Sequence, residues 1–132
     1  MNAVARGEFS VKLAPLAFEG APDKSLLGRM SIDKQIAGDL VATTKGQMLS
    51  AMTETKGSAG YVAIELVEGT LHGKSGAFTL QHTGTMNRGA PSLSVTVVPD
   101  SGRGDLVGIE GVFEIIIEEG KHSYVFSYSL PR

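Results

Sequence analysis

The sequence predicts an all-β fold, a single antiparallel eight-stranded β-barrel domain that spans residues 1–132 and contains at most one short helical turn. Apolar and polar residues alternate with a period of two along most of the chain, as in half-buried strands. Turns rich in glycine, which supplies 17 of the 132 residues, interrupt this alternation at short, even intervals. Eight strands in so short a chain favour a closed barrel, with a sandwich as the alternative, because large open sheets usually curl or split.

The expected strands, in chain order, cover residues 7–18, 27–37, 39–55, 61–72, 76–86, 93–99, 106–118 and 122–130. In the first strand, Phe9, Val11 and Leu13 form one face and polar residues form the other. In the second strand, apolar side chains alternate with Ser31 and Asp33, and this apolar set is Met30, Ile32 and Ile36. The third strand is the least regular, because residues 47–52 could also form a helical turn.

The last two strands form a hairpin whose register can be predicted. A two-residue turn at Glu119–Gly120 brings apolar residues of both strands onto one face, as cross-strand pairing requires. The expected pairs are Ile117 with His122, Ile115 with Tyr124, and Phe113 with Phe126. We expect this mainly apolar face to point into the barrel.

The fourth and fifth strands form a second hairpin, with its turn centred on Lys74–Ser75. In this register His82 lies opposite Val67 and diagonal to Glu65, and diagonal neighbours lie within reach of long side chains. The expected inward face holds Tyr61, Ala63, Glu65, Val67, Gly69 and Leu71 with Phe78, Leu80 and His82. The outward face then carries the apolar residues Val62, Ile64 and Leu66.

Glu65 and His82 are the candidate catalytic residues. A carboxylate and an imidazole inside an apolar barrel are costly unless they are paired or hydrated, and such pairs are suited to proton transfer. The alternative interpretation is a buried hydrogen bond with a structural role. The candidate ligand-binding residues are Tyr61, Glu65, His82, His122 and Tyr124. For His122 and Tyr124 the alternative is a barrel rim, where polar groups reach water.

Composition excludes several classes of protein. Twelve Lys and Arg against 14 Asp and Glu leave a net charge of −2, so the basic surface that nucleic acids require is missing. The chain has no cysteine, and the spacing of its three histidines does not suggest a metal site. We expect neither a metal nor a cofactor. We also expect no membrane association, because no apolar run approaches about 18 residues, and we expect a cytoplasmic location, because the first residues lack an apolar signal core.

Several segments, taken in order, resemble a known family. They read GYVAIE at residues 60–65, GTLHGKSGAFTLQHTGTM at 69–86, VVPDSGRGDL at 97–106 and GKHSY at 120–124. They resemble the bacterial family catalogued as domain of unknown function 3224, over residues 7–130. That family is similar in fold to allene oxide cyclase, so the resemblance implies an eight-stranded antiparallel barrel. It implies no activity, because the family is uncharacterised and fold alone does not define chemistry.

Three hypotheses for function follow from these observations. In the first, the barrel interior binds a small, largely apolar molecule, and the inward residues Gly69 and Gly111 either bend the sheet or leave space. In the second, Glu65 and His82 perform cofactor-free isomerase or lyase chemistry at the same site. In the third, the chain is a structural or interaction module without a ligand, and its outward apolar residues form a homodimer.

Overall fold

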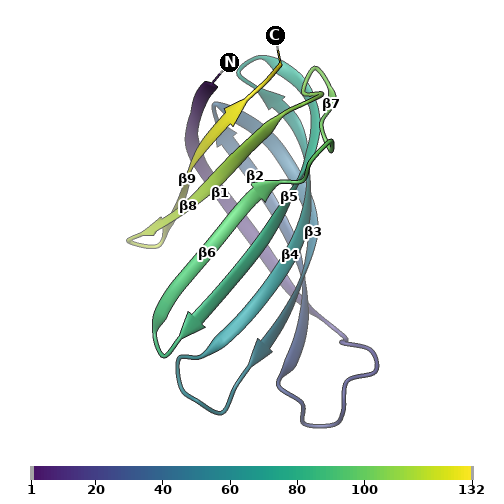
Figure 1. Cartoon of the computed structure of the whole chain (residues 1–132), viewed down its shortest axis with the longest axis vertical. Helices are drawn as coiled ribbons and strands as arrows, with labels where there is room; N and C mark the ends of the chain where they lie inside the picture. Colours follow the sequence, from purple (N-terminus) through teal and green to yellow (C-terminus); the bar gives the residue numbers. More distant parts are fainter. Residues whose placement is uncertain (1, 132) are drawn as a thin grey trace.

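The computed structural model describes residues 2–131, and these residues form strands and connecting turns (Figure 1). The strands are β1 (Asn2–Leu16), β2 (Leu27–Gly38), β3 (Leu40–Met52), β4 (Ala59–Leu71), β5 (Lys74–Asn87), β6 (Ala90–Val97), β7 (Arg103–Gly104), β8 (Glu110–Glu118) and β9 (Lys121–Ser129). None of the described residues belongs to a helix of the length and apolar character that crossing a bilayer requires.

Eight of these strands close into a barrel. Hydrogen-bonded neighbours run in the order β4, β3, β2, β1, β9, β8, β6 and β5, and β5 pairs with β4 to complete the circle. Every pairing is antiparallel. The two-residue strand β7 only adds to the edge of β5 at one end. The predicted all-β, antiparallel eight-stranded barrel is therefore confirmed, whereas the similarity to allene oxide cyclase stays a prediction.

The β8–β9 hairpin has the predicted register. Its turn lies at Glu119–Gly120, where both residues have positive φ, as a two-residue type I′ turn requires. The pairs Ile117–His122, Ile115–Tyr124 and Phe113–Phe126 are all present. The alternation of apolar and polar residues, together with turn chemistry, was sufficient to specify this hairpin.

The β4–β5 turn differs from the prediction. It lies at His72–Gly73 and not at Lys74–Ser75, so His82 faces Ala63 instead of Val67. His72 and Gly73 have φ angles of 46° and 80°, and this pair forms a type I′ turn that matches the twist of the flanking strands. Because the turn moves by two residues, the inward and outward faces stay as predicted: Glu65 and His82 are buried, and Val62, Ile64 and Leu66 are exposed.

Several strand boundaries also differ from the prediction. β1 begins at Asn2 rather than at residue 7, because the small inward residues Ala3 and Ala5 continue its alternation. Residues 47–52 form strand, as the predicted third strand has them, and the alternative of a helical turn is wrong. β8, predicted over residues 106–118, begins at Glu110, and the preceding residues form a turn that buries Leu106 and Ile109.

The chain termini lie at one end of the barrel (Figure 1), which we call the closed end because buried side chains fill it. Leu106 and Ile109 belong to the core there. Five inward rings pack against one another with centroids 5.1–5.6 Å apart, and these rings are Phe78, Phe113, Tyr124, Phe126 and Tyr128. Such ring pairs add to the stability of a core beyond the area they bury.

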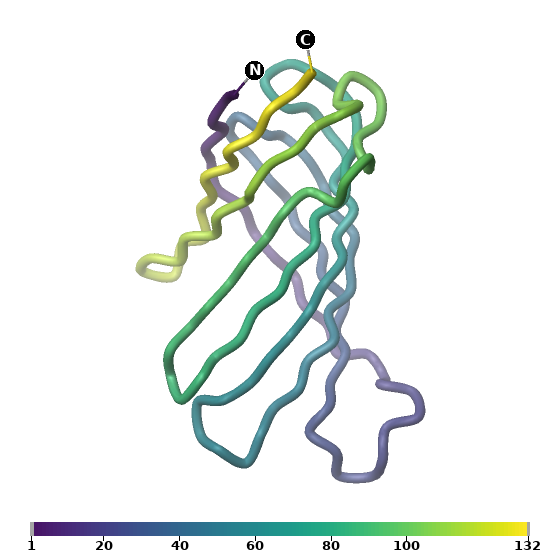
Figure 2. The backbone as a smooth tube through the Cα atoms, in the orientation of Figure 1, coloured from purple at the N-terminus to yellow at the C-terminus, as the bar shows by residue number. Residues whose placement is uncertain are grey.

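The opposite end, which we call the open end, carries the turns that precede β2, β4 and β6. Between β6 and β8 the barrel wall is held by one pairing, Thr96 with Val112. Beyond this pairing the β8–β9 hairpin diverges from β6 toward the open end (Figure 2). Inward-facing side chains near this seam are therefore partly exposed, and Ile117 reaches 64%.

Candidate functional site

Three polar side chains meet inside the barrel, at the boundary between the aromatic core and the open end. Lys34 comes from β2, Glu65 from β4 and His82 from β5, and they are exposed by only 4%, 0% and 3%. One carboxylate oxygen of Glu65, Oε1, contacts both partners. It accepts hydrogen bonds from Lys34 Nζ at 3.1 Å and from His82 Nε2 at 2.8 Å. We call these three residues the polar cluster.

The polar cluster holds Glu65 in its charged form. Burial alone raises the pKa of this carboxyl, but the hydrogen bond from His82, the charge of Lys34 and the nearby Thr44 hydroxyl outweigh burial and lower the pKa to about 2. Its second oxygen, Oε2, is buried and makes no hydrogen bond of standard geometry with the described residues. An ionised carboxylate can only accept hydrogen bonds, so Lys34 and His82 must both act as donors.

A cavity of about 190 Å³ lies next to the polar cluster on the side of the open end. Lys34, Tyr61, His82 and His122 supply its polar groups. Its apolar lining consists of Phe9, Val11, Leu13, Ile32, Met48, Leu93, Ile115 and Ile117. Lys34 Nζ also lies 4.9 Å from the centre of the Phe9 ring, within the range of a cation–π interaction.

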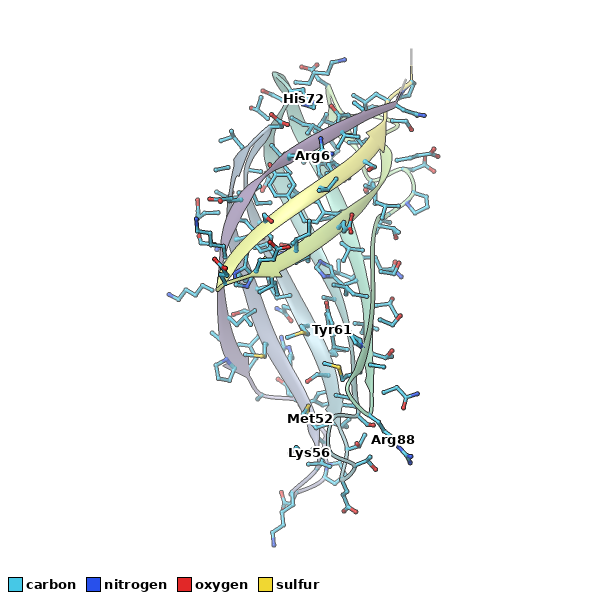
Figure 3. All side chains as sticks on the ribbon, turned by 90° about the vertical axis from the view of Figure 1, so that its left-hand side faces the viewer. Arg6, Met52, Lys56, Tyr61, His72 and Arg88 are labelled. Carbon is cyan, nitrogen blue, oxygen red and sulfur yellow. The ribbon has the colours of Figure 1, made fainter. Side chains whose placement is uncertain are left out.

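A second, larger hollow of about 460 Å³ continues from this cavity to the open end. Met48, Tyr61 and Leu93 border both spaces. The methionines at its walls are Met30, Met48, Met52 and Met86. Figure 3 shows Tyr61 near the middle of the molecule and Met52 closer to the open end, with sulfur atoms in between. We call this hollow the methionine mouth.

The family comparison covers nearly the whole barrel. The model of the family described as "Protein of unknown function (DUF3224)" matches residues 5–128. The chain belongs to this family. The DUF3224 match includes most of β1 and β9, the other six barrel strands in full, and every residue of the polar cluster.

A solved structure of another DUF3224 protein has the same fold. It is a protein of unknown function from Shewanella oneidensis MR-1, 47% identical to this chain, with a TM-score of 0.91. The alignment covers 100% of both chains. No curated protein matches this DUF3224 chain significantly.

The structure brings together most of the residues predicted for the site. Tyr61, His82 and His122 line the cavity, and Glu65 lies behind them, where it contacts His82. Tyr124 lies apart from the cavity. Its hydroxyl donates to the carbonyl of Ala37 at 2.8 Å and accepts the backbone N–H of Leu40 at 3.0 Å. Tyr124 therefore supports the β2–β3 turn, and its role as a ligand contact stays a prediction.

Lys34 is the residue of the site that sequence reasoning missed. It occupies an inward position of β2, two residues from Ile32 and two from Ile36. A lysine flanked in this way by buried apolar residues has no water around its ammonium group, so a buried carboxylate partner becomes necessary. The alternation in β2 places Lys34 on the inward face, and this position indicates an acidic partner inside the barrel, such as Glu65.

The chemistry available to the cavity is that of hydrogen bonds and proton transfer. Burial and the charge of Glu65 raise the pKa of Tyr61, so its hydroxyl is neutral at physiological pH. The cavity lining contains no Ser, Thr or carboxylate side chain. Within residues 2–131, no group of three His, Asp or Glu side chains is arranged to hold a metal ion.

Proposed function

We propose that this protein binds one small, largely apolar molecule inside the open half of the barrel, with a polar atom of the ligand next to Lys34 and His82. The observation that carries this proposal is the cavity itself, whose walls are apolar except at four side chains, Lys34, Tyr61, His82 and His122. Ligand sites are commonly apolar pockets in which a few polar groups fix orientation. An eight-stranded barrel has room for one small ligand.

The charges of the polar cluster favour an uncharged polar group on the ligand. Lys34 and Glu65 form an ion pair at 3.1 Å, so their charges cancel when His82 is neutral. A carbonyl or hydroxyl group can accept a hydrogen bond from Lys34 without adding a net charge to a poorly hydrated site. A carboxylate would add a buried negative charge, which is costly without a further cation.

The methionine mouth supports the same proposal. Methionine side chains are flexible and polarisable, and they adapt to irregular apolar shapes. Met52 and Met86 are more than one third exposed at the open end, where a ligand would enter. The volume of about 460 Å³ falls within the range of small-molecule sites.

Saturation-transfer NMR with two probes of similar size, cyclohexanone and cyclohexanecarboxylate, tests this proposal. We expect cyclohexanone to bind, and to bind more tightly than the carboxylate. Leu93→Trp should abolish binding, because Leu93 borders both the cavity and the methionine mouth. The matched control is Val41→Trp on the outer face, where the side chain is 60% exposed.

The proposal fails if neither probe binds, or if Leu93→Trp binds cyclohexanone as well as the wild-type protein does. Leu93 is itself 47% exposed, so the larger side chain can be accommodated without loss of the fold. Circular dichroism and thermal melting of both tryptophan variants establish that they remain folded.

A further inference from the structure

The hydrogen bond between Glu65 and His82 determines which nitrogen of His82 carries the proton. Glu65 is ionised and can only accept, so Nε2, at 2.8 Å from Oε1, must donate. In the neutral imidazole the lone pair then lies on Nδ1. Nδ1 has no hydrogen-bond partner among the described residues, and the His82 ring lines the cavity. His82 Nδ1 is therefore a proton acceptor at the border of the cavity, and the Glu65 carboxylate orients the ring through its hydrogen bond with Nε2.

Lys34 places a cationic donor beside this acceptor. Its ammonium group contacts the same oxygen of Glu65 as His82 Nε2 does, so the two side chains lie close together. An ammonium group has three donors, and one of them is used by Glu65. A base and a fixed positive charge at one end of an apolar cavity are the two groups that removal of a proton next to a carbonyl requires.

We propose that this site catalyses proton transfer at the carbon next to the carbonyl group of a small, apolar ketone. This inference rests on the binding function proposed above and names its substrate class. Lys34 donates a hydrogen bond to the ketone oxygen, and His82 Nδ1 takes a proton from the α-carbon. The electrons of the broken C–H bond form the carbon–carbon double bond of an enolate, whose negative oxygen is stabilised by Lys34.

In a β,γ-unsaturated ketone the protonated His82 returns the same proton to the γ-carbon. The product is the conjugated α,β-unsaturated isomer. The step moves one proton and one double bond, so it needs no oxidant, reductant or second substrate. Glu65 touches neither the cavity nor the ketone in this scheme, and it is a positioning residue that orients His82 and stabilises its charged form.

The test uses cyclohex-3-en-1-one, whose conversion to cyclohex-2-en-1-one is followed by ultraviolet absorbance. A second assay follows exchange of the α-hydrogens of cyclohexanone in deuterium oxide by NMR. We expect the protein to accelerate both reactions well beyond an equal concentration of free imidazole. His82→Gln retains a donor for Glu65 but lacks a base, and it should lose about 100-fold or more of the rate. Lys34→Met should lose a comparable factor.

Matched controls separate the chemistry from general effects of substitution. His72→Asn removes a histidine that lies at the closed end and outside the cavity. Lys45→Met breaks an exposed ion pair with Asp33 on the neighbouring strand. Both variants should keep the wild-type rates. A loss in either control as large as the loss in His82→Gln would overturn the assignment of the reaction to the polar cluster.

A spectroscopic measurement on the wild-type protein tests the positioning role of Glu65 without relying on the folding of a variant. The ¹⁵N shifts of His82 should show a protonated Nε2 and an unprotonated Nδ1 in the wild-type protein. Glu65→Gln, which can either donate or accept, should mix the two tautomers and slow the exchange reaction. A proton on Nδ1 in the neutral wild-type ring would overturn the inference outright.

The binding and rate measurements together distinguish the two proposals. If cyclohexanone binds and neither reaction is faster than with imidazole, the catalytic inference is wrong and the binding function stands. If cyclohexanone does not bind, both are wrong.

Discussion

Lys34 and Glu65 form a buried ion pair that stabilises the barrel only as long as both partners are present. Removing one partner of such a pair typically costs about 3–5 kcal/mol, because the remaining charge is left without compensation. A well-packed apolar pair at the same positions would often be at least as stable. Burial of Lys34, Glu65 and His82 beside a cavity is therefore more easily explained by function than by stability.

The pKa of Glu65 predicts a specific dependence of stability on pH. Its folded-state pKa of about 2 lies below the ordinary value of 4.5, so its contribution is complete above pH 4.5 and is lost as the pH falls toward 2. The full contribution corresponds to about 3 kcal/mol, and about 2 kcal/mol of it should already be lost at pH 3. Urea unfolding at pH 6 and pH 3 measures the decrease in unfolding free energy between these two pH values. This decrease should be about 2 kcal/mol smaller in Glu65→Gln than in the wild-type protein.

Asp33→Asn is the control for this pH effect, because Asp33 pairs with Lys45 on the exposed surface. Its unfolding free energy should fall between pH 6 and pH 3 in parallel with the wild-type value. An NMR titration of the Glu65 carboxyl carbon gives the pKa directly. A midpoint near 4.5 would refute the electrostatic description of the polar cluster.

Tyr124 and Tyr61 should respond differently to removal of their hydroxyl groups. Tyr124→Phe leaves the buried backbone N–H of Leu40 without its acceptor, which should cost about 1–3 kcal/mol of unfolding free energy. The Tyr61 hydroxyl has no hydrogen-bond partner among the described residues, so Tyr61→Phe should change stability by less than about 0.5 kcal/mol. Equal effects in urea unfolding would contradict the structural role of Tyr124.

Residue alternation explains how much of the site was predictable. Glu65 and His82 share the inward parity of strands β4 and β5, so their placement on one face followed from the sequence. Their direct contact with each other and with Lys34 did not, because it depends on the twist and coiling of β2, β4 and β5, which alternation does not specify. The depth of the cavity likewise depends on side-chain packing across the barrel.

The β4–β5 hairpin shows where sequence reasoning fails at the level of elements. A glycine at position 73 and another at position 76 each allow a turn. The observed turn at His72–Gly73 lies two residues before the predicted one, and a shift of two residues leaves every side chain on its predicted face. The deciding factor is that His72 and Gly73 both take positive φ. The pairs Asn-Gly, Asp-Gly and Gly-Gly are the usual signatures of such a turn, so His72–Gly73 is only a weak turn signal in the sequence.

Two glycines of β4 should differ sharply in their tolerance of a side chain. A Cβ at Gly69 would lie 2.1 Å from the carbonyl oxygen of Val41 on β3, whereas one at Gly60 would find its nearest neighbour at 3.7 Å. Gly69→Ala should therefore force β3 and β4 apart and cost about 2 kcal/mol or more. Gly60→Ala should stay within about 0.5 kcal/mol of the wild type. Similar urea midpoints for the two variants would contradict this packing.

The single pairing between β6 and β8 makes this seam the weakest part of the barrel wall. Backbone groups on the facing edges, beyond Thr96 on one side and Val112 on the other, lack a strand partner. Native-state hydrogen exchange should show fast exchange for amides on these edges and slow exchange in β3 and β4, which pair along their whole length. Uniform protection around the barrel would refute a seam of low stability.

At the scale of the whole molecule, the outer face of β4 bears on the homodimer hypothesis, because it exposes apolar side chains. Val62, Ile64 and Leu66 are 50%, 53% and 40% exposed there, and a second copy of the chain would cover them. Light scattering of the purified protein should then give twice the mass of one chain. Ile64→Lys should halve it, whereas Glu114→Lys on β8 should not. A monomeric wild-type protein would refute the dimer.

The central claim, that the open half of the barrel holds a small ligand beside the polar cluster, is most directly tested by isotope-filtered NOE measurements on the protein with cyclohexanone. We predict contacts from the probe to the methyl groups of Ile32, Met48 and Ile115, which line the cavity. Contacts confined to Val62 and Ile64 on the outer face, or no contacts at all, would contradict the claim.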